Sequence, residues 1–228
     1  MAAATGNGQP VWTSFFFVIV PSLLILTWFG VPLVQGVRRR RATQETHQLF
    51  ATGRYLETLT QIKRARRLWP SWEGLTFLQG KTELVLWRVD AARATLHRLM
   101  SLGLGFEPQD ERIVFTTALI AAEVAGDAEN VRERVAAARY HEAYLVLPNL
   151  IRAARERDHA LVLELASQED LIPREFMPLV RVLAAWSREE AAPQAIDPIP
   201  LLGETGLDQV EKVWPDLADF IRRAPRPS

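Results

Sequence analysis

The stretch from Gly53 to Pro70 reads GRYLETLTQIKRARRLWP. Glycine readily adopts the left-handed conformation that ends one helix before the next begins, so Gly53 marks a turn. Apolar residues such as Tyr55 and Ile62 then recur at helical spacing, and Pro70 cannot continue a helix. The stretch therefore predicts a tight turn followed by an amphipathic helix that must pack against other helices.

The same helical periodicity extends on both sides of this stretch, and no convincing strand pattern appears between residues 42 and 190. Gly and Pro residues fall between the apolar segments, and the connections are short. Short connections place successive helices antiparallel, so we predict an all-α domain of stacked helix pairs. The predicted helices span residues 42–52, 55–68, 72–86, 89–101, 109–125, 128–140, 142–156, 159–168 and 174–190.

The motif after Gly53 resembles the second half of a tetratricopeptide repeat. Gly53, Tyr55, Ala65 and Pro70 match the positions of that family's turn, aromatic residue, small residue and proline. Thr58 stands where the family usually has alanine. The match implies that this helix is the second of a pair.

Later units resemble the same pattern less closely. Small residues stand at Gly80, Ala92 and Ala138, at positions where helices of the family approach each other. The resemblance covers residues 42–170 and implies a solenoid of helical hairpins, in which each pair buries its apolar face against its neighbours. The predicted turns are 34, 39 and 31 residues apart, against a family period of about 34. They lie at Gly53, Trp87, Gly126 and Arg157.

The resemblance also implies a binding surface, because the first helix of each pair lines the concave face of such solenoids. Several residues at these positions are apolar. Two interpretations are open: the groove binds an apolar peptide, or another part of the chain covers these positions. Carried over by position, the protein-binding groove consists of Phe77, Lys81, Leu84, Thr116, Ile120, Glu123, Tyr144, Leu147 and Ile151.

The first 37 residues contain no charged side chain, and their apolar centre, from Phe15 to Val34, reads FFFVIVPSLLILTWFGVPLV. Twenty helical residues cover about 30 Å, the thickness of the hydrocarbon core of a bilayer. A cleaved signal peptide would need a basic start and a shorter apolar run, and a buried core helix is usually shorter as well. We therefore predict a transmembrane helix at residues 12–37 after a short tail at residues 1–11.

Four arginines, Arg38 to Arg41, follow the predicted span directly, whereas the tail before it has no Lys or Arg. Positive charge is retained on the cytoplasmic side of a membrane. The tail is therefore expected on the non-cytoplasmic side, and the domain at residues 38–190 in the cytoplasm. Arginine outnumbers lysine and alanine is abundant, as in many GC-rich bacterial genomes, so the expected location is a bacterial inner membrane.

Charge is distributed unevenly along the chain. Residues 38–70 carry a net charge of +7, and the remaining residues carry −7. Basic side chains next to a span attract anionic lipid headgroups, at about 1 kcal/mol per charge, and nucleic acid is the less economical partner. We expect headgroup contacts and no nucleic acid. The expected contacts are Arg38, Arg39, Arg40, Arg41, Lys63, Arg64, Arg66 and Arg67.

No motif in the chain indicates catalysis. The chain has no cysteine, so it has no disulfides and no thiolate metal sites. Its four histidines have no partner at metal-ligand spacing, and no HExxH, GxSxG, phosphate-binding loop or kinase motif is present. We therefore predict no catalytic residue, no cofactor and no metal, and we do not expect an enzyme.

Residues 191–228 begin with a proline-rich stretch, which predicts a linker. Apolar residues such as Val210 and Leu217 then recur at helical spacing. Pro215 suits the first turn of a helix, and Arg222 suits its last turn. We predict a C-terminal helix that caps the solenoid, and the alternative is a docking motif for a partner.

Together these features predict a membrane-anchored, cytoplasm-facing scaffold or assembly factor for a membrane or envelope complex, which acts by binding other proteins. Two alternatives are open. One is an adaptor that presents substrates to a membrane protease or a biosynthetic enzyme, and the other is a structural subunit of a large membrane complex. The sequence does not indicate the oligomeric state or the identity of the client.

Overall fold

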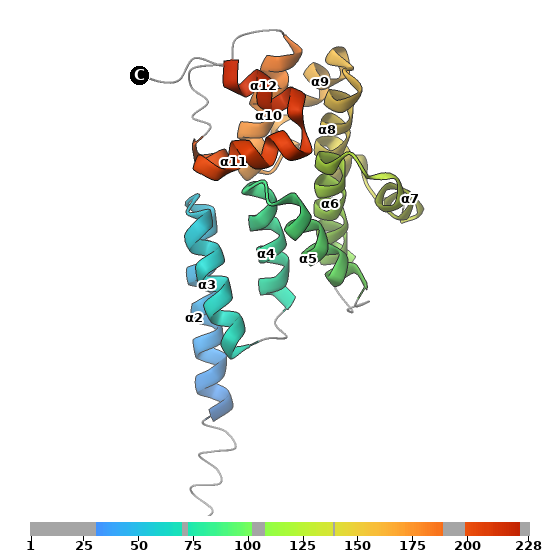
Figure 1. The fold of residues 1–228 in the computed structure, drawn as a ribbon. Coiled ribbons are helices and arrows are strands. Elements are labelled where there is room, and N and C mark those ends of the chain that lie inside the picture. The colour runs from blue at the N-terminus through green and yellow to red at the C-terminus, as the bar shows by residue number, and fades with distance from the viewer. Residues whose placement is uncertain (1–30, 70–72, 102–107, 139, 189–198, 224–228) are drawn as a thin grey trace, which may run out of the picture. The chain divides into compact units, whose positions relative to one another are not determined.

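The computed structural model describes residues 31–69, 73–101, 108–138, 140–188 and 199–223, and all regular structure in these residues is helical. The chain is therefore all-α in the part that the structure describes (Figure 1). The helices are α2 (Val31–Ala51), α3 (Tyr55–Leu68), α4 (Glu73–Val85), α5 (Val89–Ser101), α6 (Pro108–Ala125), α7 (Glu129–Ala137), α8 (Val146–Glu156), α9 (His159–Ala166), α10 (Met177–Ser187), α11 (Ile199–Val213) and α12 (Pro215–Arg223). Short 3-10 helices are η2 (Glu142–Leu145), η3 (Glu169–Leu171) and η4 (Arg174–Phe176).

Most predicted helices are present, and two of them, at 55–68 and 89–101, agree with α3 and α5 at both ends. The prediction at 42–52 was wrong at its start, because α2 begins at Val31 and continues without a break through the arginine run. Arginine is a good helix former, and proline is tolerated in a first helical turn, so nothing in this stretch interrupts the helix.

The chain divides within α2 into two compact units, residues 1–47 and residues 48–228. In the described part of the first unit, Leu33, Val34 and Val37 are exposed, and Arg41 Nε lies 3.2 Å from Glu45 Oε1. None of the described helices combines the length and apolar character that a membrane crossing requires. Residues 12–30 of the predicted span lie outside the described residues, and residues 31–37 belong to the start of α2.

Four turns of the second unit end a helix with the same pair of backbone hydrogen bonds. Each turn has one residue with φ between 58° and 76°. The N–H of that residue donates to the carbonyl three residues earlier, and the next N–H donates to the carbonyl five residues before it, at 2.8–3.3 Å. This is the Schellman geometry of helix ends. The left-handed residues are Gly53, Trp87, Gly126 and Arg157, so the four predicted turn positions are confirmed.

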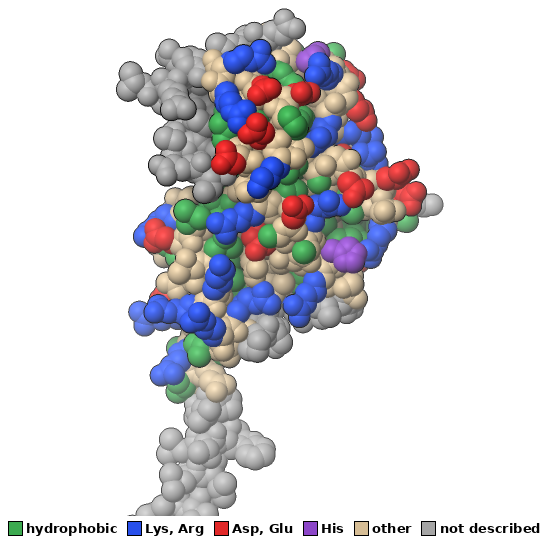
Figure 2. Space-filling model, viewed as in Figure 1, with side chains coloured by type: hydrophobic (Ala, Val, Ile, Leu, Met, Phe, Trp, Pro, Cys, Tyr) green, Lys and Arg blue, Asp and Glu red, His purple; other side chains and the backbone are tan. Residues whose placement is uncertain are grey.

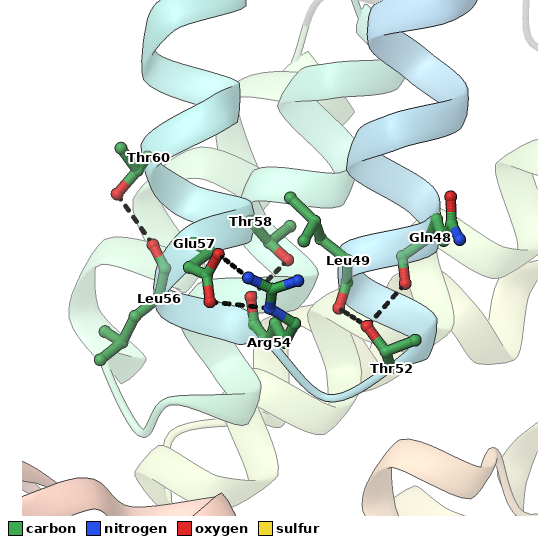
Figure 3. Close-up of polar contacts among 8 residues, drawn as sticks. All are labelled: Gln48, Leu49, Thr52, Arg54, Leu56, Glu57, Thr58 and Thr60. Atoms are coloured by element: carbon green, nitrogen blue, oxygen red, sulfur yellow. Dashed lines mark hydrogen bonds and ion pairs between the residues drawn. The ribbon is translucent and has the colours of Figure 1, made fainter.

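Side chains reinforce the first of these turns (Figure 3). The Thr52 hydroxyl donates to the carbonyls of Gln48 and Leu49 at 2.9 Å and 3.0 Å. Arg54 Nε donates to Glu57 Oε1 at 2.7 Å. The Thr52 hydroxyl thereby bonds two of the last carbonyls of α2, and the Arg54–Glu57 pair bridges the start of α3.

The close approach of α4 and α5 depends on two small residues. Gly80 is buried, and a Cβ atom added there would lie 2.9 Å from Leu96 Cγ. Ala92 is completely buried. Both residues therefore lie at a contact between helices, as predicted. The third, Ala138, is exposed at the end of α7, so its prediction as a helix contact was wrong: α7 ends at Ala137, before this residue can face α6.

One main core runs through the second unit from α4 to α12. A smaller core between α3 and α4 contains Ile62, Ala65, Leu75 and Leu78. Helix α7 packs on α6 and projects from it in Figure 1. The largest fully buried side chains of the main core are Leu96, Leu99, Leu150, Ile151, Leu183, Leu217, Val85, Val89, Val124 and Val162.

The C-terminal region forms two helices, α11 and α12, where the sequence predicted one. Pro215 has no N–H group, so it ends the hydrogen-bond ladder of α11 and occupies the first turn of α12. Val210, Trp214, Leu217 and Ala218 are buried in the main core, so both helices pack on the hairpins. The predicted linker at 191–200 lies outside the described residues except for its end, where α11 begins at Ile199.

Candidate functional site

The nine residues of the predicted groove differ in exposure. Five of them are buried: Leu84, Ile120, Glu123, Leu147 and Ile151. The other four, Phe77, Lys81, Thr116 and Tyr144, are half-buried. A partner that reached this face would therefore meet the half-buried residues first, and the role of all nine in binding stays a prediction.

One of the buried apolar positions, Leu84, lies against C-terminal segments of the same chain. Leu84 on α4 and Val124 on α6 share a cavity of about 10 Å³ with Phe176 of η4 and Leu179 of α10. A space of this size holds at most one water molecule. Of the two interpretations left open by the sequence, the structure therefore favours coverage of this position by the chain itself.

A polar cluster borders this covered region. Lys81 forms an ion pair with Glu175 of η4, and its Nζ lies 5.2 Å from the ring centroid of Phe50. Phe50 and Tyr55 meet edge to face, with their centroids 5.3 Å apart. Burial raises the pKa of the Tyr55 hydroxyl, and the nearby Glu175 carboxylate adds to the effect. Lys81 therefore holds η4 in place rather than facing solvent freely.

Arg155 on α8 fixes the C-terminal helices. Its Nη2 donates to the carbonyl of Val213 at 3.0 Å and to the carbonyl of Val124, and its guanidinium carbon lies 4.3 Å from the ring centroid of Trp214. Burial lowers the pKa of Arg155, and the negative charge of Glu123 opposes that shift. A single half-buried cation thus connects α6, α8 and the junction of α11 and α12.

A second network crosses α3, α4 and α5. Arg66 Nη1 donates to Gln79 Oε1 at 2.6 Å, and Gln79 Nε2 donates to Glu83 Oε1 at 2.7 Å. The Thr95 hydroxyl donates to the other oxygen of this buried carboxylate at 2.9 Å. Arg66 was predicted to contact lipid headgroups, but it is half-buried and engaged in this network.

The other predicted headgroup residues are exposed. Arg38 to Arg41 are exposed in the first unit, and Lys63, Arg64 and Arg67 are exposed on α3 of the second unit. Over the C-terminal helices, Figure 2 shows acidic and basic side chains side by side, in agreement with the ion pair between Arg157 and Asp216 at 2.8 Å. Basic residues without acidic partners thus characterise α3 more than the C-terminal end.

A pocket of about 370 Å³ that the sequence reasoning missed lies between α9 and α10. Arg181 and Arg188 are among its lining residues, and Ala184 and Ala185 lie between them in the sequence. The pattern of two arginines seven residues apart with small residues midway was visible in the sequence as one helix face. This spacing matches no known motif, so the sequence alone did not predict a site here.

Among the residues that the structure describes, no group of three or more His, Cys, Asp or Glu side chains has an arrangement suited to a metal ion. Comparison of the chain with models of protein families, with curated proteins and with solved structures gives no match. The features of this chain that bear on its function are therefore its helix-ending turns, its charges and its pocket.

Proposed function

We propose that this protein is a membrane-anchored scaffold whose helical hairpins bind other proteins on the cytoplasmic side of a bacterial inner membrane. The observation that carries this proposal is the fourfold recurrence of one helix-ending turn, at Gly53, Trp87, Gly126 and Arg157. Stacked helix pairs present extended surfaces that such proteins use for binding. The repeated turn therefore favours a protein-binding solenoid of tetratricopeptide type.

The close packing of α4 on α5 supports the same assignment. Gly80 and Ala92 occupy the contact between these two helices, as expected for a unit of that family. Helix α7 and the exposed Ala138 depart from the pattern. We assign α4–α5 and α8–α9 as regular hairpins of the solenoid and α6–α7 as a divergent one.

The proposed anchor rests on charge. The first 37 residues have no charged side chain, and four arginines follow. A membrane span with a basic cytoplasmic flank has this composition. Anchoring raises the local concentration of a bound client and can increase avidity by about 10²–10⁴ without new contacts, which gives a scaffold a physical reason to be tethered.

Photo-crosslinking in intact membranes tests the binding role. A crosslinking side chain at Phe77 or Tyr144 should capture the same client protein, because both residues are half-buried on the predicted inner face. The matched control is Leu56, which is exposed outside that face. Capture of one set of proteins from all three positions would contradict a specific site.

Deletion of residues 1–41 distinguishes the proposed scaffold from the alternative, a structural subunit of a large membrane complex. A scaffold should still bind its client through the hairpins once it is released from the membrane. Loss of association with an intact helical fold would instead assign the interaction to the N-terminal region. A reporter fused after Ser228 should be active only on the cytoplasmic side, and activity on the other side would contradict the orientation.

A further inference from the structure

The pocket between α9 and α10 has an apolar floor and two arginines among its lining residues. Leu163 and Ala166 of α9 face Met177, Val180 and Ala184 of α10 across it. Leu163, Ala166, Met177 and Ala184 are half-buried, so the floor is open to solvent. Small side chains at Ala166, Ala184 and Ala185 create the hollow, because larger ones would fill the space between the helices.

Arg181 of α10 and Arg188, which follows the end of that helix, both line the pocket. Both side chains are exposed, and within the described residues neither guanidinium has an ion-pair or hydrogen-bond partner. Arg188 follows Arg181 by seven positions, which corresponds to about 10 Å along a helix axis. Two unpaired cations thus line a pocket with an apolar floor, and an acidic partner would complement them.

Other polar groups of the pocket restrict the ligand. The Ser167 hydroxyl already donates to the Glu164 carbonyl at 2.6 Å, so it is not free to donate to a phosphate. The exposed Glu169 carboxylate also lines the pocket, so an acidic ligand must place its negative groups at the arginines and away from Glu169. Two carboxylates spaced along a partner helix would give each arginine its own acidic partner.

We infer that this pocket binds an amphipathic helix of a client protein, with acidic residues at positions i and i+7 and apolar residues at i+3 and i+4. Residues at these spacings share one face of a helix. The apolar pair enters the hollow over Ala184 and Ala185, and the carboxylates pair with Arg181 and Arg188. Helix-in-groove binding is a common mode of peptide recognition. The inference deepens the proposed scaffold function and rests on it.

Binding of a designed peptide to the full chain tests this inference. The peptide is a labelled alanine-rich helix with Glu at i and i+7 and Leu at i+3 and i+4, and fluorescence anisotropy reports binding. We expect saturable binding that weakens as salt rises, and at least a tenfold loss in the double variant Arg181→Glu/Arg188→Glu. The matched control Arg98→Glu/Arg174→Glu reverses two exposed charges outside the pocket and should bind as the wild type does.

A charge swap keeps the test independent of folding. A peptide with Lys in place of both Glu residues should bind Arg181→Glu/Arg188→Glu better than it binds the wild type. Ala184→Trp should block both peptides without any change of charge. Equal affinities of the wild type and the double variant for the Glu peptide would overturn the inference, as would absence of binding to the wild type.

The chain itself supplies one competing occupant, since Glu189 and Glu190 follow Arg188 directly in the sequence. If only the variant Glu189→Gln/Glu190→Gln bound the peptide, the pocket would belong to the chain's own segment and the inference would be wrong. The scaffold function would survive that result if crosslinking from Phe77 and Tyr144 still captured a client. Loss of that capture, with peptide binding intact, would contradict the groove at Phe77 and Tyr144 as the client site and leave the pocket as the binding site of the scaffold.

Discussion

Trp87 and Arg157 adopt left-handed conformations that L-residues with side chains avoid, with φ of 58° and 59°. Such a conformation costs about 1–2 kcal/mol per residue. Trp87 is buried in the main core, so its packing offsets that cost. Arg157 instead pairs with Asp216 at the surface. The same turn is therefore stabilised in different ways at different positions, and of the four turns only those at Gly53 and Gly126, which have no such compensation, use glycine.

Gly53 and Gly126 allow the backbone cost to be separated from the cost of crowding. Gly53 has a positive φ, but a Cβ atom there would meet nothing within 4 Å, so Gly53→Ala should destabilise the fold by about 1–2 kcal/mol through backbone strain alone. Gly126→Ala should cost more, because its Cβ would also lie 3.1 Å from Arg155 Nη1. Urea unfolding of both variants measures the difference, and equal losses would contradict this account.

Gly80 differs from Gly53, because its backbone has ordinary helical geometry but there is no space for an added side chain. Its added Cβ would lie 2.9 Å from Leu96 Cγ, so Gly80→Ala should reduce the free energy of unfolding by about 1–3 kcal/mol through overpacking. The control is Gly36→Ala, where a Cβ would meet nothing within 4 Å. Chemical unfolding followed by circular dichroism compares them. A stabilising effect of Gly80→Ala would show that α4 and α5 are not closely packed.

The Tyr55 hydroxyl provides a measurable sign of burial near Lys81 and Glu175. Burial, aided by the Glu175 carboxylate, raises its pKa above the usual value of 10.0. The folded state therefore keeps the proton where the unfolded chain releases it, so this stabilising contribution is present below that usual value and is lost as pH rises through the folded pKa. Phenolate absorbance of the wild type minus that of Tyr55→Phe should titrate above the usual value, and titration at or below it would contradict the packing around Glu175.

At the scale of the elements, local sequence signals predicted the helices and their turns well. The ends of α3 and α5 and the start of α12 at Pro215 follow from short-range chemistry, which the sequence displays directly. The break between α11 and α12 was missed, because the apolar spacing continues through Trp214 and Pro215 as if in one helix. The sequence predicted that Pro215 lies in the first turn of a helix, but it did not predict that Pro215 also ends the helix before it.

The candidate site was harder to predict, because an apolar helix face looks the same whether it meets a ligand or the chain's own core. Leu84, Ile120 and Leu147 have the spacing of a groove, yet they are buried in the main core with η4 and α10. Arg66 likewise belonged to a basic run, but a partner thirteen residues later, Gln79, takes its side chain. Such long-range pairings are decided by tertiary packing, which spacing alone does not reveal.

Trp214 lies at the junction of α11 and α12 and packs against α8 and α10. It is 4% exposed, meets Trp186 edge to face at 5.9 Å and lies under the Arg155 guanidinium. Trp214→Ala should therefore destabilise the fold by about 3–5 kcal/mol. The control Leu171→Ala removes a side chain from a residue that is 47% exposed and should change stability by less than about 1 kcal/mol. Urea midpoints from circular dichroism measure both, and similar values would mean that α11 and α12 do not depend on this packing.

At the scale of the whole molecule, the dominant asymmetry is electrostatic. The net charge of zero is the sum of +7 on residues 38–70 and −7 on all others. An anionic surface would attract the first part and repel the second. If the proposed anchor holds residues 38–70 next to a membrane, their basic side chains would add an electrostatic attraction to the attachment.

Vesicle binding by a chain that lacks residues 1–30 tests whether charge alone directs the protein to lipid. We expect it to bind vesicles that contain an anionic lipid and not neutral ones, with an affinity that falls as salt rises. Reversing the exposed basic residues of α3, in Lys63→Glu/Arg64→Glu/Arg67→Glu, should weaken binding by at least about 1 kcal/mol for each charge removed.

The matched control for this variant reverses three exposed arginines elsewhere, in Arg98→Glu/Arg112→Glu/Arg174→Glu. It carries the same net charge as the α3 variant, so any difference between the two reports the position of the charge rather than its amount. Sedimentation with vesicles measures both affinities. If the two variants bound equally well, total charge would explain the association. The basic face of α3 would then have no part in seating the protein on a membrane, and Arg38 to Arg41 would be left as the remaining candidates for headgroup contact.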